Sequence, residues 1–371
     1  MTETLRPPAT RLAVGMDYRP AVLTSSGIGR SVRELARAMA QRDEIDLHLF
    51  AHSWSRAHRA DVTPPGAQLH RLPIPGRGLP WLSRLRLTTP ALCGGVPVFH
   101  WTDYVHPPVR DERVVLTLHD VAFAADRAFH GDQSDELHER SRLAAARADV
   151  IVTPTRATAA AAARAFQLEE DRIEVVPFGA DHVPPADTSE PPLEGPYILS
   201  LGTIEPRKNH LRLIRAWRGL PAPRPALVLV GRPGWDCDEV LATIQEEQRR
   251  GELRWFDTLP DAEVFRWLRH ARLLAYPSLL EGFGFPPLEA LSVRTPVVAG
   301  DNAALRETLG DAAQFCDPTD EDSITDALAT VLGDRDHRST LLDRGARRVA
   351  DFTWSASAAG YARAYAAAAR S

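Results

Sequence analysis

Lysine is almost absent from this chain. The sequence has 44 Lys and Arg side chains, and only one of them, Lys208, is lysine. Heavy use of Arg, Ala and Pro is typical of a GC-rich coding sequence, which favours arginine wherever either cation would serve. We therefore expect position 208, within LGTIEPRKNHLRLIRAW (residues 201–217), to need a compact ammonium rather than a planar guanidinium.

Cysteine and long apolar runs are also scarce. Cys93, Cys237 and Cys316 lie far apart and form no CxxC pair, which argues against a disulfide framework or a zinc knuckle and favours a reducing cytoplasm. The first twenty residues contain no long apolar core, and no apolar run is long enough to span a bilayer. We expect a cytoplasmic protein that is not integral to a membrane.

The chain has no excess of positive charge. Its 49 Asp and Glu side chains outnumber the basic ones and give a formal net charge of −5, which argues against a nucleic-acid partner. Hydrophobic residues make up 44% and charged residues 25% of the sequence, as in an ordinary folded protein. A length of 371 residues suits two domains better than one.

Short apolar runs alternate with helical patterns along the whole chain, which predicts an α/β fold with parallel sheets. The segment 183–196, rich in Pro and acidic residues, indicates a linker between domains at 1–182 and 197–354. An alanine-rich terminal helix at about 355–371 is expected to pack back across the junction. The predicted strands are RLAVGMD, IDLHLF, VVLTLHD and VIVTPT before the linker, and YILSLG, ALVLVG, LRWFD, RLLAYPS and PVVAG after it.

A glycine-containing loop within YPSLLEGFGFPPLEALSVRTPVVAG (residues 276–300) leads into a predicted helix. Gly282 and Gly284 permit close backbone approach, and one of the two prolines that follow suits the first helical position. The free N–H groups and positive dipole end of such a helix form an anion site suited to a diphosphate.

Two carboxylates flank this predicted anion site. Glu281 precedes the glycines and Glu289 lies inside the helix. Carboxylates accept paired hydroxyl hydrogen bonds, so the two could hold two sugars on either side of the phosphates. A pair of surface glutamates beside a structural turn is the alternative interpretation.

Arg207 and Lys208 fall at a predicted strand-to-helix corner. Cations at a helix N-terminus oppose the dipole unless an anion lies between them and the amides, so a bound phosphate would remove the conflict. A solvated basic corner is the alternative, and the rarity of lysine counts against it.

Two further features lie in the first half of the chain. Gly27 and Gly29, in TSSGIGRSVREL (residues 24–35), open a predicted helix. A dinucleotide fingerprint is disfavoured because position 32 is Val rather than Gly and no acid follows the next strand at the expected place. His119 ends a predicted strand, where ligand-facing residues of open α/β sheets lie, although a structural pairing with Asp120 is an alternative.

Taken together, these features resemble the retaining glycosyltransferases of GT-B fold, glycosyltransferase group 1 or family 4, which include bacterial mannosyl- and glucosyltransferases. The resemblance covers nearly the whole chain. Its hallmark is a pair of glutamates separated by seven residues, here Glu281 and Glu289. The other motifs in family order are GIGR, the HD strand end, VVPFGAD (175–181), EPRKN and the tryptophan that opens the last helix, Trp354.

The resemblance implies two Rossmann-like domains facing each other across a cleft, the first binding the acceptor and the second the nucleotide-sugar donor. It implies that Lys208 and Arg207 bind the donor diphosphate. Glu281 would contact the transferred sugar, Glu289 the nucleotide ribose and His119 the donor sugar. The remaining donor-binding residues implied are Gly27, Gly29, Gly202, Gly282, Phe283, Gly284 and Phe285.

One motif departs from the family. Many members have Gly-Arg after the first strand of the second domain, whereas this chain has Gly202-Thr203, so the second phosphate cation would have to be Arg207. No Asp-x-Asp motif stands in a suitable loop, and neither a metal nor a cofactor is expected.

The implied reaction is transfer of a hexose to an acceptor hydroxyl with retained anomeric configuration. The sequence motifs of the first domain are most similar to those of the subgroup that builds polysaccharides from GDP-mannose, so a glycan or lipid-linked acceptor is expected.

Residues 71–90 combine arginines with Trp81 and leucines and indicate either peripheral contact with the inner face of the cell membrane or an ordinary loop and short helix. Other interpretations are a sugar-nucleotide epimerase, a phosphorylase, which would need a second lysine for pyridoxal phosphate, and a non-catalytic sugar-nucleotide-binding subunit.

Overall fold

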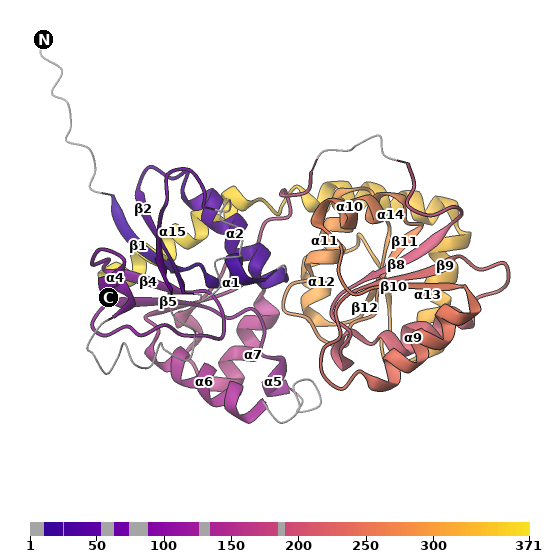
Figure 1. Ribbon diagram of the computed structural model, residues 1–371, viewed down its shortest axis with the longest axis horizontal. Coiled ribbons are helices and arrows are strands. Elements are labelled where there is room, and N and C mark those ends of the chain that lie inside the picture. Colours follow the sequence, from indigo (N-terminus) through magenta and orange to yellow (C-terminus); the bar gives the residue numbers. More distant parts are fainter. Residues whose placement is uncertain (1–10, 25, 53–62, 74–87, 126–133, 185–189) are drawn as a thin grey trace, which may run out of the picture.

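The computed structural model describes residues 11–24, 26–52, 63–73, 88–125, 134–184 and 190–371. Two α/β domains lie side by side, and the terminal helix returns from the second to the first (Figure 1). Each domain is built on one parallel sheet, in agreement with the predicted α/β class.

The first domain has a seven-stranded sheet in the order β3-β2-β1-β4-β5-β6-β7, with every pair parallel. Its strands are β1 Leu12–Asp17, β2 Ile45–His52, β3 Gln68–Leu72, β4 Val98–Trp101, β5 Arg113–Thr117, β6 Val150–Thr153 and β7 Ile173–Val175. Its helices are α1 Arg19–Leu23, α2 Gly27–Met39, α4 Thr89–Leu92, α5 Ala122–Ala125, α6 Ser134–Arg147, α7 Arg156–Phe166 and the 3₁₀ helix Glu170–Arg172.

The second domain has a six-stranded parallel sheet in the order β10-β9-β8-β11-β12-β13. Its strands are β8 Tyr197–Leu201, β9 Ala226–Val230, β10 Leu253–Phe256, β11 Leu273–Tyr276, β12 Val297–Gly300 and β13 Gln314–Cys316. Its helices are the 3₁₀ helix Pro206–Lys208, α8 His210–Arg218, α9 Asp238–Arg250, α10 Asp261–His270, α11 Phe285–Ser292, α12 Ala303–Leu309, α13 Glu321–Gly333 and α14 Arg335–Val349.

The central strands of both sheets are covered on both faces, which explains their near-continuous apolar sequences. All five residues of β8 are buried, as are all four of β11 and of β12. In each sheet the strand order reverses beside the first strand, between β1 and β4 in one and between β8 and β11 in the other. Ligands of open α/β sheets bind outside the carboxyl ends of the strands at such a reversal.

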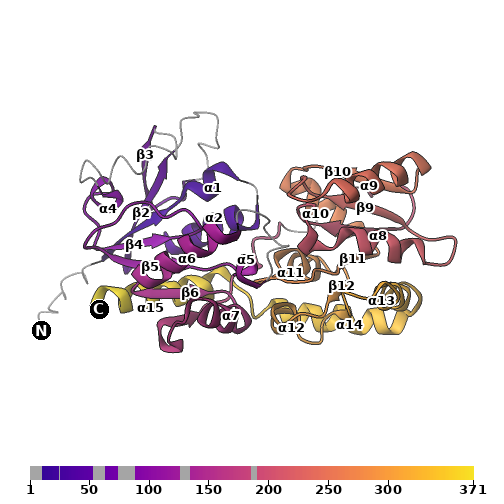
Figure 2. The same cartoon turned by 90° about the horizontal axis from the view of Figure 1, so that it is seen from below.

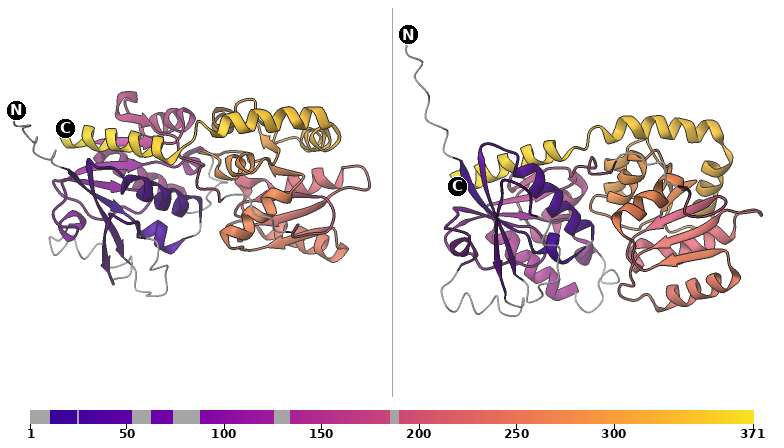
Figure 3. Two further views of the ribbon diagram at one scale, coloured as in Figure 1. Left: turned by 90° about the horizontal axis from the view of Figure 1, so that it is seen from above. Right: turned by 45° about the horizontal axis from the view of Figure 1, so that its top comes forward.

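Helix α15, Trp354–Arg370, lies along the first domain, whereas helix α14, which precedes it by a short connection, lies on the second (Figures 2 and 3). Its tyrosines reach into the first sheet: Tyr361 Oη lies 2.9 Å from Thr117 Oγ1, and Tyr365 Oη lies 2.9 Å from His100 Nδ1. The last helix therefore ties the second domain to the first through buried hydrogen bonds.

A second connection joins the two domains directly. The N-terminal amides of α7, those of Arg156 and Ala157, donate to the carboxylate of Glu307 on α12 at 2.8 and 3.0 Å. Thr155 and Thr158 donate their hydroxyls to the Gly282 carbonyl at 2.9 and 3.1 Å. The Glu307 carboxylate at the N-terminus of α7 is electrostatically favourable and joins α12 to the first domain. The two threonine hydroxyls hold the Gly282 loop against the first domain.

Candidate functional site

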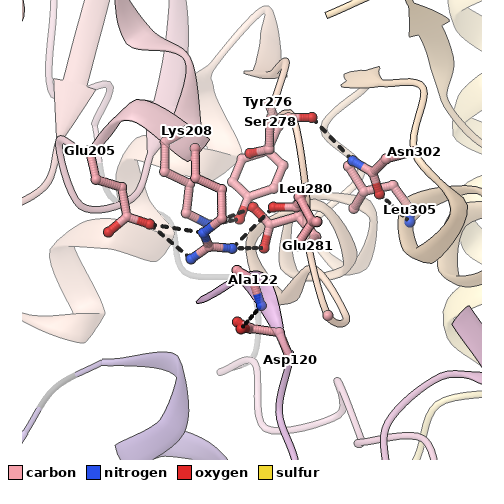
Figure 4. Close-up of polar contacts among 12 residues, drawn as sticks. Asp120, Ala122, Glu205, Lys208, Tyr276, Ser278, Leu280, Glu281, Asn302 and Leu305 are labelled. Carbon is pink, nitrogen blue, oxygen red and sulfur yellow. Dashed lines mark hydrogen bonds and ion pairs between the residues drawn. The ribbon is translucent and has the colours of Figure 1, made fainter. Parts of the chain in front are cut away.

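Lys208 and Arg207 converge on the carboxylate of Glu281 (Figure 4). Lys208 Nζ donates to Glu281 Oε1 and to Tyr276 Oη, both at 2.6 Å. Arg207 donates to Glu281 Oε2 at 3.2 Å and to the Leu280 carbonyl at 3.1 Å. Only 12% of the Lys208 side chain and 7% of the Glu281 side chain are exposed, so Lys208 is not a solvated surface cation.

The backbone explains why these groups meet. Strand β8 leads to Lys208 and its neighbour β11 leads to Glu281, so both follow the carboxyl ends of the strands at the order reversal. Asn209, in the left-handed conformation with φ 63°, turns the chain into α8. Its side-chain amide donates to the Pro277 carbonyl at 3.0 Å and fixes the basic corner to the loop after β11.

The charges of this cluster are strongly coupled. Burial opposes ionisation of Glu281, but Lys208 and Arg207 outweigh it and lower the pKa of that carboxyl to about 2. Burial also lowers the pKa of Lys208, with Glu281 acting in the opposite direction. Glu205 contributes a second carboxylate, 2.8 Å from Arg207 Nη2. Glu281 is therefore ionised at neutral pH.

The first domain contributes an acidic side chain to the same region. Asp120 follows β5 and lies below Glu281 in Figure 4. Its Oδ1 accepts from the Ala122 amide at 3.0 Å and from the Tyr104 hydroxyl at 3.3 Å. Burial lowers the pKa of Arg207, but the carboxylates of Glu281 and Asp120 outweigh it and raise that pKa above its usual range. Asp120 thus acts electrostatically across the domain boundary.

The glycine loop is shaped by close contacts. A Cβ on Gly282 would lie 1.9 Å from the carbonyl oxygen of His119, so only glycine fits against that strand end. Gly284 has φ 98° and precedes α11. Pro286 and Pro287 lack N–H groups, so amide donors for an anion at this helix end must come from residues 282–285.

Glu289 lies in a separate cluster between the domains and is 1% exposed. Arg30, the last residue of GIGR, forms an ion pair with it and a second one with Asp261 at 3.0 Å. His182 Nδ1 accepts from the Trp354 indole at 3.2 Å, so Nε2 carries the proton and donates to Glu289 at 3.0 Å. Burial opposes the charge of Glu289, yet Arg30 and His182 outweigh it and lower its pKa.

His119 is buried at the domain interface. Its Nε2–H donates to the Thr102 carbonyl at 2.8 Å, and its ring stacks on Phe178 with a centroid distance of 5.5 Å. Burial lowers the pKa of His119, so the imidazole is neutral at pH 7. The phenyl rings of Phe283 and Phe285 pack on the same Phe178 ring, at 5.3 and 5.4 Å.

The remaining predicted glycines have different surroundings. A Cβ on Gly27 would lie 3.5 Å from the Phe285 ring of the other domain, whereas one on Gly29 would lie 2.5 Å from Thr24 Oγ1. Gly29 is thus required for packing within the first domain. Gly202, with φ 146°, lies beside the Lys208 side chain, since its Cβ would be 3.5 Å from Lys208 Cδ.

The structure therefore brings Lys208, Arg207, Glu281 and Gly202 together, with the His119 carbonyl against Gly282, and places Glu289 in its own cluster. Sequence reasoning missed several residues that complete these clusters: Arg30, Asp120, His182, Glu205 and Tyr276. Arg30, Asp120 and Glu205 did stand inside the motifs GIGR, HD and EPRKN, which was the available signal.

The described part of the chain contains neither a metal-ligand cluster nor a membrane-spanning helix. Among these residues, no three or more His, Cys, Asp or Glu side chains are grouped so that they could hold a metal ion. No helix of the described residues is long and apolar enough to cross a membrane. The segment 71–90, considered for membrane contact, lies mostly outside the described residues, because 74–87 are not among them.

Two family models and a curated relative match most of the chain. A family model described as glycosyl transferases group 1 matches residues 187–348, and one described as glycosyltransferase family 4 matches residues 25–183. The chain is 29% identical over 363 residues to O-antigen chain mannosyltransferase B of Escherichia coli, covering 89% of this chain and 93% of that one.

Solved structures share the fold at low sequence identity. Sucrose-phosphate synthase from Thermosynechococcus elongatus has a TM-score of 0.78 and 18% identity, covering 96% of this chain and 98% of that one. HepE from Anabaena, solved with UDP and glucose, has a TM-score of 0.74 and 16% identity, covering 96% and 99%. The predicted GT-B fold is confirmed, and the chain belongs to the group 1 glycosyltransferases.

Proposed function

We propose that this glycosyltransferase moves a hexose, with mannose favoured, from a nucleotide diphosphate sugar to an acceptor hydroxyl with retained anomeric configuration. GDP-mannose is the favoured donor. The observation that carries the proposal is the buried pair Lys208 and Arg207 at the strand-order reversal, facing the first domain. Two fixed cations match the charge that develops on a departing diphosphate.

Donor binding changes the hydrogen bonding of Glu281, because the donor binds the same two cations. A diphosphate that binds Lys208 and Arg207 takes over their hydrogen bonds, and the ionised Glu281 then accepts from hydroxyls of the transferred sugar. The amides of residues 282–285 and the backbone at Gly202, beside the Lys208 side chain, complete the phosphate site. His119 and the backbone at Gly27 border the donor sugar from the first domain, whereas the buried Gly29, whose N–H donates to Ser26 Oγ, only permits the tight turn that leads into α2.

Glu289 is proposed to hold the ribose. A carboxylate offers about four lone-pair positions, so it can accept from ribose hydroxyls beside its contacts with Arg30 and His182. The rings of Phe283 and Phe285 stabilise the loop between the two glutamates by packing on Phe178.

The chemical step requires no covalent enzyme intermediate in this proposal. The bond between the anomeric carbon and the diphosphate oxygen breaks, and the acceptor oxygen attacks the same face of the sugar. The acceptor proton passes to the leaving diphosphate oxygen. The protein supplies placement of both sugars and stabilisation of the departing charge.

The acceptor is proposed to be a glycan or glycolipid of polysaccharide biosynthesis, at the cytoplasmic side of the membrane. The printed name of the Escherichia coli relative, an O-antigen chain mannosyltransferase, supports a saccharide acceptor.

A panel of nucleotide sugars tests donor binding. We expect GDP-mannose to raise the melting temperature of the chain, because a ligand present at a hundred times its Kd stabilises the folded state by about 2.7 kcal/mol. GMP and free mannose, which lack the diphosphate, should have much smaller effects. A panel in which no nucleotide diphosphate sugar stabilises the chain would contradict the proposed donor site.

Chelation tests the role given to the cations. We expect activity to survive EDTA, because Lys208, Arg207 and backbone amides meet the diphosphate charge without a metal ion. The measurement is the rate of GDP release from GDP-mannose before and after chelation. If EDTA abolishes activity and Mg²⁺ or Mn²⁺ restores it, the proposal that the diphosphate charge is met without a metal ion is wrong.

A further inference from the structure

A second cluster of charged residues lies at the corresponding position of the first sheet. Asp17 ends β1, Arg19 begins α1, and Asp103 follows β4, so the cluster lies outside the strand-order reversal between β1 and β4. The Arg19 guanidinium forms an ion pair with Asp103, and its Nη2 lies 3.5 Å from Asp17 Oδ2. Such a reversal is the expected ligand position of an open α/β sheet.

The three side chains differ in their exposure to solvent, and this difference decides which of them can contact a ligand. The Asp17 side chain is fully buried, whereas 12% of the Arg19 side chain and 12% of the Asp103 side chain are exposed. The Arg19 amide also donates to Asp17 Oδ1 at 3.1 Å. Arg19 and Asp103 can therefore meet a ligand, and Asp17 can only hold Arg19.

The hydrogen bonding of the cluster is incomplete. Among the residues that the structure describes, Asp17 Oδ2 and Arg19 Nε are buried atoms without a hydrogen-bond partner. A buried polar group without a hydrogen-bond partner destabilises the folded state, so a purely structural ion pair would be expected to satisfy both atoms. The cluster is therefore not a fully hydrogen-bonded structural ion pair.

Short contacts connect the cluster to the proposed donor site. The Thr102 hydroxyl donates to the Asp17 carbonyl at 2.7 Å, and the Thr102 carbonyl accepts from His119 at 2.8 Å. Tyr104, next to Asp103, donates to Asp120, which lies below Glu281 in Figure 4 and interacts electrostatically with Arg207. The cluster thus lies on the side of the first domain that faces the donor site.

We propose that Arg19 and Asp103 bind the hydroxyl groups of a neutral sugar acceptor and that Asp17 is a positioning residue for Arg19. The proposal rests on the proposed transfer reaction and names the acceptor site for it. A guanidinium donates and a carboxylate accepts, so adjacent sugar hydroxyls can bind both at once.

The charge of the cluster argues for a neutral acceptor. Two carboxylates face one guanidinium, and burial raises the pKa of Asp17 to about 7. Even with Asp17 protonated, Asp103 balances Arg19 and no net positive charge remains. The nearby Arg140 donates to the Tyr104 carbonyl and pairs with Glu136 at 3.8 Å. Among the residues that the structure describes, a phosphorylated acceptor would find no unbalanced cation in this cluster.

The test uses the full chain with GDP-mannose as donor and methyl α-mannoside as acceptor. We expect Asp103→Asn to raise the KM for methyl α-mannoside about tenfold or more, because a hydrogen bond to a charged group is lost. The rise in melting temperature caused by GDP-mannose should stay as in the wild type, which also shows that the variant is folded. Arg19→Lys should likewise raise the KM for methyl α-mannoside and leave the stabilisation by GDP-mannose unchanged.

Asp149→Asn is the matched control. The Asp149 side chain is also 12% exposed and paired with an arginine, Arg113. It precedes β6 and so lies at the amino ends of the strands, away from the Arg19 cluster at their carboxyl ends, and its replacement should leave the acceptor KM unchanged. An unchanged KM for methyl α-mannoside in Asp103→Asn would overturn the acceptor site. The neutral-acceptor proposal would also be wrong if GDP-mannose stabilises the wild type but the enzyme prefers mannose 6-phosphate to methyl α-mannoside. A wild type that no nucleotide sugar stabilises contradicts the donor proposal instead.

Discussion

Replacing Glu281 by glutamine is expected to lower kcat by about a hundredfold to a thousandfold, while GDP-mannose binds as tightly as before or more tightly. The carboxylate lies 2.6 Å from Lys208 Nζ and is held ionised by its two cations. Interactions that strengthen as charge develops in the transition state change kcat, and losing one such group costs about that much. Removing the negative charge also removes the carboxylate that competes with the diphosphate for both cations.

Glu289→Gln provides the contrast to Glu281→Gln. Its carboxylate is proposed to hold a ribose whose charge does not change during the reaction, so we expect a higher Kd for GDP-mannose and a kcat within a few-fold of wild type. Steady-state kinetics and titration of the donor measure the two parameters. Equal effects on kcat and on binding in both variants would count against the separate roles.

Lys208→Arg is expected to impair transfer by about a hundredfold, although the charge is unchanged. The Nζ atom fits between Tyr276 Oη and Glu281 Oε1, each 2.6 Å away, and only 12% of the side chain is exposed. A guanidinium is larger and planar, so it would displace either these partners or the diphosphate. A displacement of about 1 Å can cost on the order of a hundredfold in rate.

The control for Lys208→Arg is the reverse exchange at an exposed position. Arg215 on α8 is 45% exposed and pairs with Glu239 and Glu321, so Arg215→Lys should leave kcat/KM unchanged. If Lys208→Arg retains kcat/KM within about threefold of wild type, equivalent to about 0.65 kcal/mol, then arginine serves at position 208 as well and the proposed fit is wrong.

The sequence predicted the strands that carry strong apolar patterns. Each of the nine predicted runs overlaps a strand of the structure, because strands buried on both faces need continuous apolar residues. Strands β3, β4, β7 and β13 were missed. QLHRL is partly exposed, VFHW contains a histidine, and IEV and QFC are three residues long, so none has a clear period or length.

The site was predicted as separate motifs but not as a set of contacts. Lys208 and Glu281 lie 73 positions apart and meet only because β8 and β11 are neighbours in the sheet. Arg30 and Glu289 lie 259 positions apart and meet only because the two domains face each other. Local sequence patterns identify strand ends and helix starts, whereas the pairing of these ends depends on strand order and domain packing.

The anomeric configuration of the first product tests the central claim, that a sugar is transferred with retention from the Lys208, Arg207 and Glu281 site. NMR of a reaction with GDP-mannose, an α-linked donor, and methyl α-mannoside gives that configuration directly. We predict an α-mannosidic product from the wild type and far less of it from Glu281→Gln. A β-linked product, or a Glu281→Gln variant that forms the α product at the wild-type rate, would contradict the account.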